Sequence, residues 1–186
     1  PNNSSAIQME SALAVLSVPY DIYTTIPAEL DLYTSVFVCL GIFSTNHVLA
    51  STEGQQLADY VNNGGYLYME GGDTWYYDAQ TAVHALFNID AQADGTSDLS
   101  TILGQSGSIT NGMSFNYSGE NSWIDHIEPI SPAVSIFQNQ SPLYGCGVAY
   151  DAGTYRTIGA SFEFGGLDDG TTPSTKTELM NQYLTF

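Results

Sequence analysis

The sequence predicts an α/β fold, with a three-layer arrangement around a mostly parallel sheet. Two stretches carry this prediction. The first, Tyr33 to Tyr77, runs through a short apolar strand, a loop, an amphipathic helix and a second apolar strand, which is the order of a βαβ unit. The second, near the carboxyl end, is a strand hairpin followed by a helix. We expect one domain over residues 1–186, with an irregular, partly β insertion at about 88–133.

The amino-terminal segment predicts a helix over residues 2–16, which Ser4 or Ser5 can cap. Its apolar face would consist of Ile7, Met9, Ala12, Leu13 and Leu16. Alternation at 20–24 then predicts a short strand. A doubly wound sheet normally begins with a strand, and none precedes this helix. We therefore expect that the first strand lies upstream in a longer protein or is supplied by a partner chain.

The βαβ unit follows. The apolar run 35–40 predicts a central parallel strand covered on both faces. Thr52 is expected to cap the next helix, and the Asn-Gly-Gly run at 63–65 to end it through a left-handed turn. The apolar segment Tyr66–Glu70 predicts the second strand of the unit, after which a glycine-acidic loop begins.

The remaining elements are shorter. We expect a helical turn at 81–87, strands at 134–137, 147–150 and 155–164, and a final helix capped at Ser174 or Thr175. The last two strands are joined by Asp-Ala-Gly-Thr, which has the composition of a hairpin turn. The strand that starts at 155 is small and apolar enough to be central in the sheet.

Acidic residues greatly outnumber basic ones. The chain has 20 acidic residues against Lys176 and Arg156, a net charge of −18. Such a chain repels phosphate backbones and anionic lipid, so we expect no nucleic-acid partner and no membrane insertion. A polar, lysine-poor surface suits an extracellular or bacterial cell-surface protein. Cys39 and Cys146 allow one disulfide at most, or two buried free thiols.

Three motifs carry a resemblance to a known family. They are SVFVCLG, then EGQQLADYVNNGGYLYMEGGD, then TIGASFEFGG before the last helix. Over residues 33–78 and 145–186 the chain resembles the class I glutamine amidotransferase-like fold. More narrowly, it looks like a domain of large secreted bacterial surface proteins. The resemblance implies a flavodoxin-like sheet.

The enzymes of that fold place a cysteine nucleophile on the turn after the strand that Tyr66–Glu70 resembles, and a His-x-Glu pair after the last core strand. Here the turn is Gly71-Gly72-Asp73, and the last strand continues into a segment with Glu163 but no histidine. A nucleophile cannot be replaced by a carboxylate without changing the reaction. The chain therefore matches a member that lacks the catalytic cysteine and histidine.

Candidate ligand-binding residues gather around the loop after Tyr66–Glu70, because open α/β sheets bind ligands at the carboxyl ends of their strands. They are His47, Glu70, Asp73, Trp75 and Glu163. The carboxylates and His47 would make a hard-cation or general acid-base site, and Trp75 offers a face for stacking on a sugar. The alternative is that Glu70 and Glu163 are buried strand-end carboxylates bonded to backbone amides.

A second pattern partly matches a calcium loop. Asp90, Gln92, Asp94 and Asp98 stand at positions 1, 3, 5 and 9, with glycine at position 6. Position 12 should be a bidentate carboxylate and is Thr101. Calcium is therefore the one cofactor that the sequence makes possible, and a solvated Asp/Gly loop is the alternative.

Three functional hypotheses follow. The leading one is a non-catalytic extracellular module for assembly, adhesion or ligand binding, with other domains of a parent chain, neighbouring copies or a glycan as partners. The second is a hydrolase of glycans or peptides acting through Glu70, Asp73 and Glu163. The third is a structural subunit of a polymer, completed by a strand from a neighbour.

Overall fold

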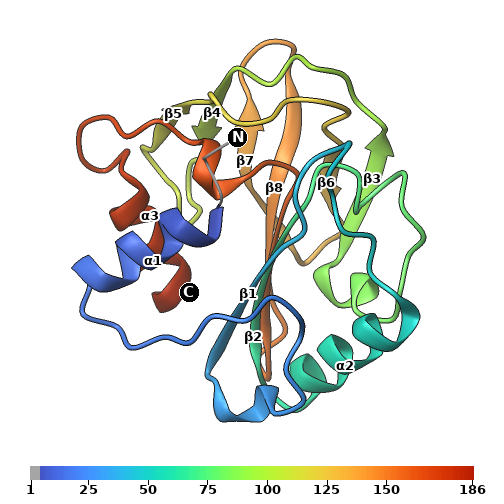
Figure 1. Ribbon diagram of the computed structural model, residues 1–186. Helices are drawn as coiled ribbons and strands as arrows, with labels where there is room; N and C mark the ends of the chain where they lie inside the picture. The colour runs from blue at the N-terminus through green and yellow to red at the C-terminus, as the bar shows by residue number, and fades with distance from the viewer. Residues whose placement is uncertain (1–4) are drawn as a thin grey trace.

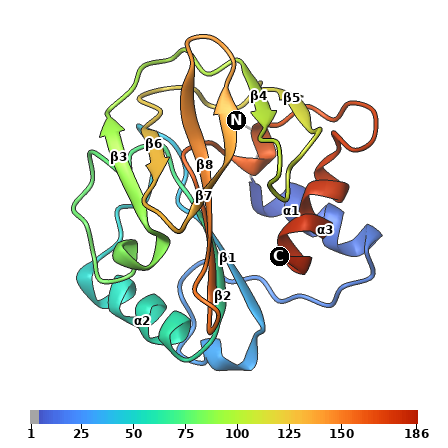
Figure 2. The ribbon, with the colours of Figure 1, turned by 180° about the vertical axis from the view of Figure 1, so that it is seen from behind.

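The computed structural model describes residues 5–186 and confirms the α/β class. One mixed sheet of seven strands, in the order β1-β2-β9-β8-β7-β4-β5, forms the middle layer. In chain order its strands are β1 (Ser35–Cys39), β2 (Tyr66–Glu70), β4 (Thr101–Gly104), β5 (Ser114–Asn116), β7 (Val134–Asn139), β8 (Tyr144–Asp151) and β9 (Arg156–Ala160). Helices α1 (Ser5–Val15) and α3 (Lys176–Thr185) lie on one side, and α2 (Ser51–Asn62) lies on the other (Figures 1 and 2).

Parallel pairing is confined to one side of this sheet. Strand β2 pairs in parallel with β1 and with β9, while β8, β7, β4 and β5 extend the sheet by antiparallel pairing. The parallel part is thus three strands wide, narrower than the mostly parallel sheet expected. Because its strands share one direction, the loops that follow Cys39, Glu70 and Ala160 meet at one edge.

Strand β1 is the outer strand of the sheet, so the prediction that 35–40 is central is wrong. No described strand pairs with the other side of β1. An upstream or donated strand could therefore pair there. The strand expected at 20–24 is also absent; this segment is an exposed connection. Its Asp21 accepts a hydrogen bond from the Tyr33 hydroxyl at 2.7 Å. The segment alternates in sequence but pairs with no neighbouring strand.

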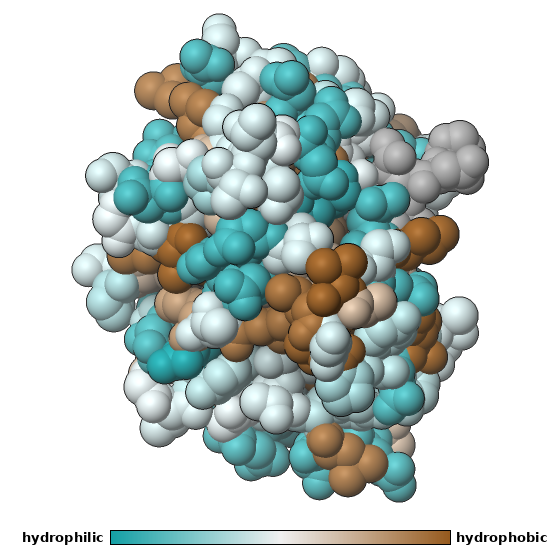
Figure 3. Space-filling view, turned by 90° about the vertical axis from the view of Figure 1, so that its left-hand side faces the viewer, coloured by the Kyte–Doolittle hydropathy of each residue, from teal (hydrophilic) through white to brown (hydrophobic). Residues whose placement is uncertain are grey.

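Helix α1 packs Met9 and Ala12 into the core, while Ile7 and Val15 remain exposed. Ile7 is therefore not part of the buried face. Figure 3 looks onto the side where α1 and α3 lie, and apolar side chains gather near the middle of that face. The expected cap Ser4 lies outside the described residues. Ser5 lies in the helix, and its hydroxyl accepts a hydrogen bond from the Gly165 amide at 2.9 Å.

Helix α2 buries the expected stripe of Leu57, Tyr60 and Val61. Its start differs from the prediction: Ala50 is the N-cap, and the Glu53 carboxylate accepts a hydrogen bond from the Ala50 amide at 2.8 Å. A carboxylate in the first turn satisfies an unpaired amide and complements the helix dipole. The expected left-handed exit is confirmed at Gly64, with φ of +97°.

The insertion predicted at 88–133 is more regular than expected. Strands β3 (Ile89–Ala93) and β6 (His126–Pro129) form a separate antiparallel ribbon beside β8, and β4 and β5 complete the far edge of the main sheet. Short strands rich in Ser, Gly and Asn show little hydrophobic alternation, so the sequence predicts them poorly. Their regular conformation depends on pairing with neighbouring strands. The 3₁₀ helix η2 (His84–Phe87) confirms the helical turn expected before the insertion.

The carboxyl-terminal hairpin and helix form as predicted, but the strand expected at 155–164 ends at Ala160. Strands β8 and β9 form the hairpin, with Gly153 at φ +81° in its turn, and β9 lies centrally between β2 and β8. Thr175 caps α3 by accepting a hydrogen bond from the Glu178 amide at 3.2 Å.

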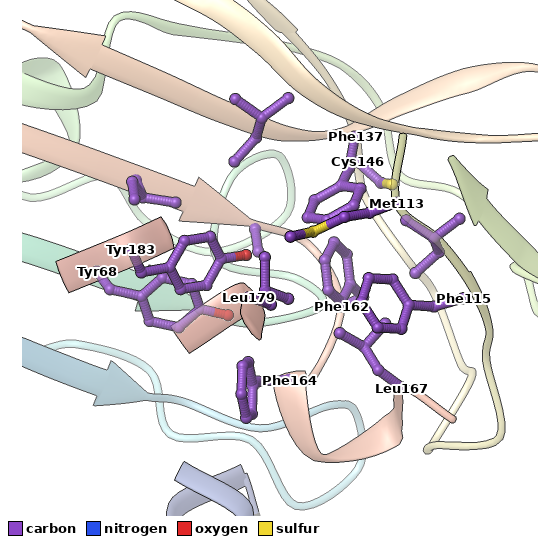
Figure 4. Close-up of a cluster of buried hydrophobic side chains, with 14 of the residues drawn as sticks. Tyr68, Met113, Phe115, Phe137, Cys146, Phe162, Phe164, Leu167, Leu179 and Tyr183 are labelled. Carbon is purple, nitrogen blue, oxygen red and sulfur yellow. The ribbon is translucent and has the colours of Figure 1, made fainter. Parts of the chain in front are cut away.

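The sheet separates two apolar cores. An aromatic-rich core lies between the sheet and helices α1 and α3, where Tyr68, Tyr183, Phe162 and Phe164 pack near one another (Figure 4). The second core lies under α2 and includes Trp75 and the side chains of Leu57 and Val61. Cys39 and Cys146 are free thiols. No described helix has the length and apolarity needed to span a membrane.

Candidate functional site

The edge where the three parallel strands end is held by backbone hydrogen bonds. The Leu40 amide donates to the Glu70 carbonyl at 2.9 Å, and the Gly71 amide donates to the Ala160 carbonyl at 3.1 Å. The Trp75 indole Nε1 donates to the same Ala160 carbonyl at 2.9 Å. The loop after β2 is therefore fixed to both neighbouring strands, and its acidic side chains have defined positions.

Glu70 is fully buried on the aromatic core's side. Its Oε2 accepts hydrogen bonds from the Tyr68 hydroxyl at 2.6 Å and the Phe164 amide at 2.8 Å. Burial raises the pKa of Glu70 to about 7, against the lowering effect of those donors and the Ser5 hydroxyl. Glu70 thus matches the alternative to a ligand-binding role: its buried carboxyl group is bonded to a backbone amide.

Glu163 does not end a strand. Strand β9 stops at Ala160, and Glu163 precedes the 3₁₀ helix η3 (Phe164–Gly166). Burial and the nearby Glu120 raise the pKa of Glu163, and its charge in turn raises the pKa of Glu70. Glu163 therefore lies close enough to Glu70 to influence its protonation.

Asp73 belongs to a different cluster. Its carboxylate lies with those of Asp94, just after β3, and Asp125, just before β6; one oxygen from each lies within 4.8 Å of the other two. We call these residues the acidic triad. Asp73 and Asp125 are 3% and 0% exposed, and Asp94 is half-buried. Sequence reasoning missed Asp125, because no spacing links it to the other two aspartates.

Backbone amides hold one oxygen of Asp125. Its Oδ2 accepts hydrogen bonds from the amides of Trp75 at 2.9 Å and Tyr76 at 2.8 Å. Burial nevertheless raises the pKa of Asp125 to about 8. Burial, with Asp78 and Asp94 adding repulsion, raises the pKa of Asp73 to about 6. The Oδ1 atoms of all three triad aspartates are buried and have no hydrogen-bond partner among the described residues.

The structure places His47 away from these carboxylates and buries the side chain of Trp75 in the core. His47 Nε2 lies 2.9 Å from the Glu53 carboxylate on the surface, at the start of α2. Trp75 is buried and packs edge-on against Phe87 with ring centroids 5.0 Å apart, so its face is not free for a sugar. Exposed aromatic surface comes instead from the next residues, Tyr76 and Tyr77, at 51% and 72% exposure.

The calcium-loop residues do not converge. Asp90 and Gln92 lie on strand β3, where the Gln92 amide donates to the Asp90 carboxylate at 2.6 Å. Asp98 accepts a hydrogen bond from the Tyr144 hydroxyl at 3.0 Å. An extended strand cannot wrap its side chains around an ion as a loop does. Only Asp94 of the four enters the acidic triad.

Comparison with known proteins identifies the fold. No family model matches the chain, and no curated protein matches its sequence. Among solved structures, the mmIFT52 N-terminal domain is similar at a TM-score of 0.65 and 13% identity, with 95% of this chain and 90% of that one covered. The cytoplasmic protein STM3548 from Salmonella typhimurium gives a TM-score of 0.64 at 13% identity, with coverage of 97% and 86%.

A β-galactosidase from Rahnella sp. R3 is also similar, at a TM-score of 0.59 and 13% identity. The alignment covers 97% of this chain but only 26% of the galactosidase, so the chain matches one part of a larger enzyme. At such identities the likeness shows a shared fold. The same architecture occurs in separate domains and inside long chains.

Proposed function

We propose that this chain is a non-catalytic binding module of an extracellular or cell-surface protein. The observation that carries the proposal is the turn after β2, where the amidotransferase-like enzymes would hold their nucleophile. Both residues there are glycines, Gly71 and Gly72. A Cβ on Gly71 would lie 3.1 Å from the Leu40 Cβ, and one on Gly72 would lie 3.0 Å from the Ile42 Cδ1. Packing leaves little room for a reactive side chain at this turn.

The burial of Glu70 also supports a binding role over hydrolysis. A general acid or nucleophile must reach the substrate, whereas Glu70 is 0% exposed. Two surface pockets, lined in part by Ser35, Arg156 and Gly64, lie at the amino ends of the parallel strands. Ligands of open α/β enzymes bind at the carboxyl ends instead.

The exposed aromatic residues supply a binding surface. Tyr76, Tyr77 and Trp123 are about half exposed or more, and we call them the aromatic edge. Their loops touch, because the Tyr76 amide donates to Asp125, two residues after Trp123. Aromatic faces stack on sugar rings, and a chain with net charge −18 favours neutral ligands over anionic ones. A neutral glycan is therefore the proposed ligand.

A binding assay tests this proposal. Neutral polysaccharides are titrated onto the parent and onto a Tyr76→Ala/Trp123→Ala double variant, with Leu143→Ala as a control at an exposed apolar site elsewhere. We expect the parent and the control to retard equally in affinity electrophoresis and the double variant to lose retardation. Equal retardation of all three, or turnover of the polysaccharide by the parent that Glu70→Gln abolishes, would reject the proposal.

The open edge of β1 favours a second candidate, assembly with neighbouring copies. An unpaired strand edge presents amides and carbonyls that another strand can join. This candidate predicts concentration-dependent oligomers in light scattering. A monomer over the whole concentration range would exclude it.

A further inference from the structure

We infer that the acidic triad of Asp73, Asp94 and Asp125 binds one divalent cation, with calcium preferred. The inference goes beyond glycan binding and does not depend on it. Three segments that are distant in the sequence bring these side chains together: the loop after β2, the end of β3 and the start of β6.

The unpartnered oxygens point to a ligand. Asp73 and Asp125 are more than nine-tenths buried, yet the Oδ1 atom of each has no donor in the described part of the chain. The buried Oδ1 atom of the half-buried Asp94 likewise has none there. Buried polar atoms are almost always paired, because an unpaired one loses its hydration without compensation. Three such atoms in one cluster indicate a shared partner that accepts electron pairs, and a metal ion is such a partner.

The protein supplies no cation of its own from its Lys and Arg side chains. The chain has only Arg156 and Lys176. Arg156 pairs with Asp151 at 3.1 Å, and Lys176 lies 3.6 Å from Asp169 and donates to the Leu167 carbonyl. Neither contact involves the triad. Neither side chain therefore offsets the negative charge that the triad carries.

The ligand set favours calcium over magnesium. The three ligand oxygens lie within 4.8 Å of one another, a spacing that admits either ion. Magnesium demands near-ideal octahedral geometry, whereas calcium tolerates an irregular set of carboxylate oxygens, with waters completing the coordination.

Terbium luminescence provides the main test, because Tb³⁺ replaces Ca²⁺ and Trp75 and Tyr76 lie next to the site. We expect saturable emission from the parent that Ca²⁺ displaces, with Mg²⁺ less effective. Asp73→Asn and Asp94→Asn should weaken binding by at least about tenfold, since affinity depends on ligand charge. Asp90→Asn and Asp98→Asn are matched controls outside the triad and should bind like the parent.

Thermal unfolding gives a readout that an ordinary structural role would not reproduce. With EDTA, Asp94→Asn should be at least as stable as the parent, because it removes repulsion within the triad. With excess Ca²⁺ the parent should gain melting temperature and the variant should not. The inference is overturned if the parent shows no saturable Tb³⁺ or Ca²⁺ response, or if Asp90→Asn weakens binding as much as Asp94→Asn. Neither assay contains a glycan, so failure here leaves the glycan-binding proposal standing.

Discussion

Glu70, the last residue of β2, and Asp73 of the acidic triad are close in the sequence, but their carboxyl groups lie in opposite kinds of environment. The Glu70 carboxyl is alone in the aromatic core and has two donors, Tyr68 and the Phe164 amide, on one oxygen. One proton makes it neutral. The triad places three carboxylates together, and the described protein donors serve Asp125 alone. Burial of one acid can be accommodated by protonation, whereas burial of three favours an external cation.

The two regions also differ in what holds them. Glu70 is fixed by a strand and by packing, so its place follows from β2. The triad depends on a loop, a ribbon and the contact between them. Substitutions in the two regions separate these two kinds of order.

Trp75→Ala should have the largest effect, because the buried Trp75 bridges the end of strand β9 and the acidic triad. Its indole donates to Ala160, and its backbone amide donates to Asp125. Removing a buried Trp side chain typically costs about 3–5 kcal/mol of the free energy of unfolding. Urea denaturation measures the loss. The neighbouring exposed Tyr76→Ala is the control and should change stability by about 0.5 kcal/mol or less; equal losses in both variants would contradict the bridging role.

Glu70→Gln should remove a pH dependence. The pKa of Glu70 rises from 4.5 unfolded to about 7 folded, so the folded state holds the proton more tightly. Its contribution to stability is full below pH 4.5 and is lost as pH rises through about 7. The loss amounts to about 3 kcal/mol. Denaturation at several pH values should show a shallower fall for the variant than for the parent; identical slopes would refute the raised pKa.

Asp125→Ala tests the amide contacts of the triad. Without the carboxylate, the buried Trp75 and Tyr76 amides lose their acceptor, which should cost about 2 kcal/mol of unfolding free energy in EDTA. Asp125→Asn keeps an acceptor oxygen at the same place and serves as the reference. If both variants unfold at the same denaturant concentration, the amide contacts contribute nothing.

Tyr68→Phe should have the smallest effect, about 1 kcal/mol, because it removes one donor from Glu70 while keeping the ring. Tyr183 is a matched control: it is also buried in the aromatic core, but its hydroxyl has no hydrogen-bond partner within residues 5–186. Tyr183→Phe should therefore be neutral or stabilising in denaturant titration. A larger loss at Tyr183 than at Tyr68 would reverse this ranking of the two hydroxyls.

The sequence by itself determined the local elements. Apolar runs predicted β2 and β9, and the stripe of Leu57 and Val61 predicted α2, because periodicity reports which face of an element is buried. The sequence did not predict that β1 is an edge strand, since an apolar run does not reveal how many neighbours a strand has.

Only the tertiary structure decided the candidate site. His47, Glu70 and Asp73 lie apart in the structure instead of in the one group expected. Trp75 lies in the core instead of on the surface. The tertiary structure joined Asp73 to Asp94 and to Asp125, which had not been singled out. The physical reason is that the site rests on contacts between segments far apart in the chain. Local periodicity and spacing contain no information about such contacts, whereas the packed sheet and ribbon determine them.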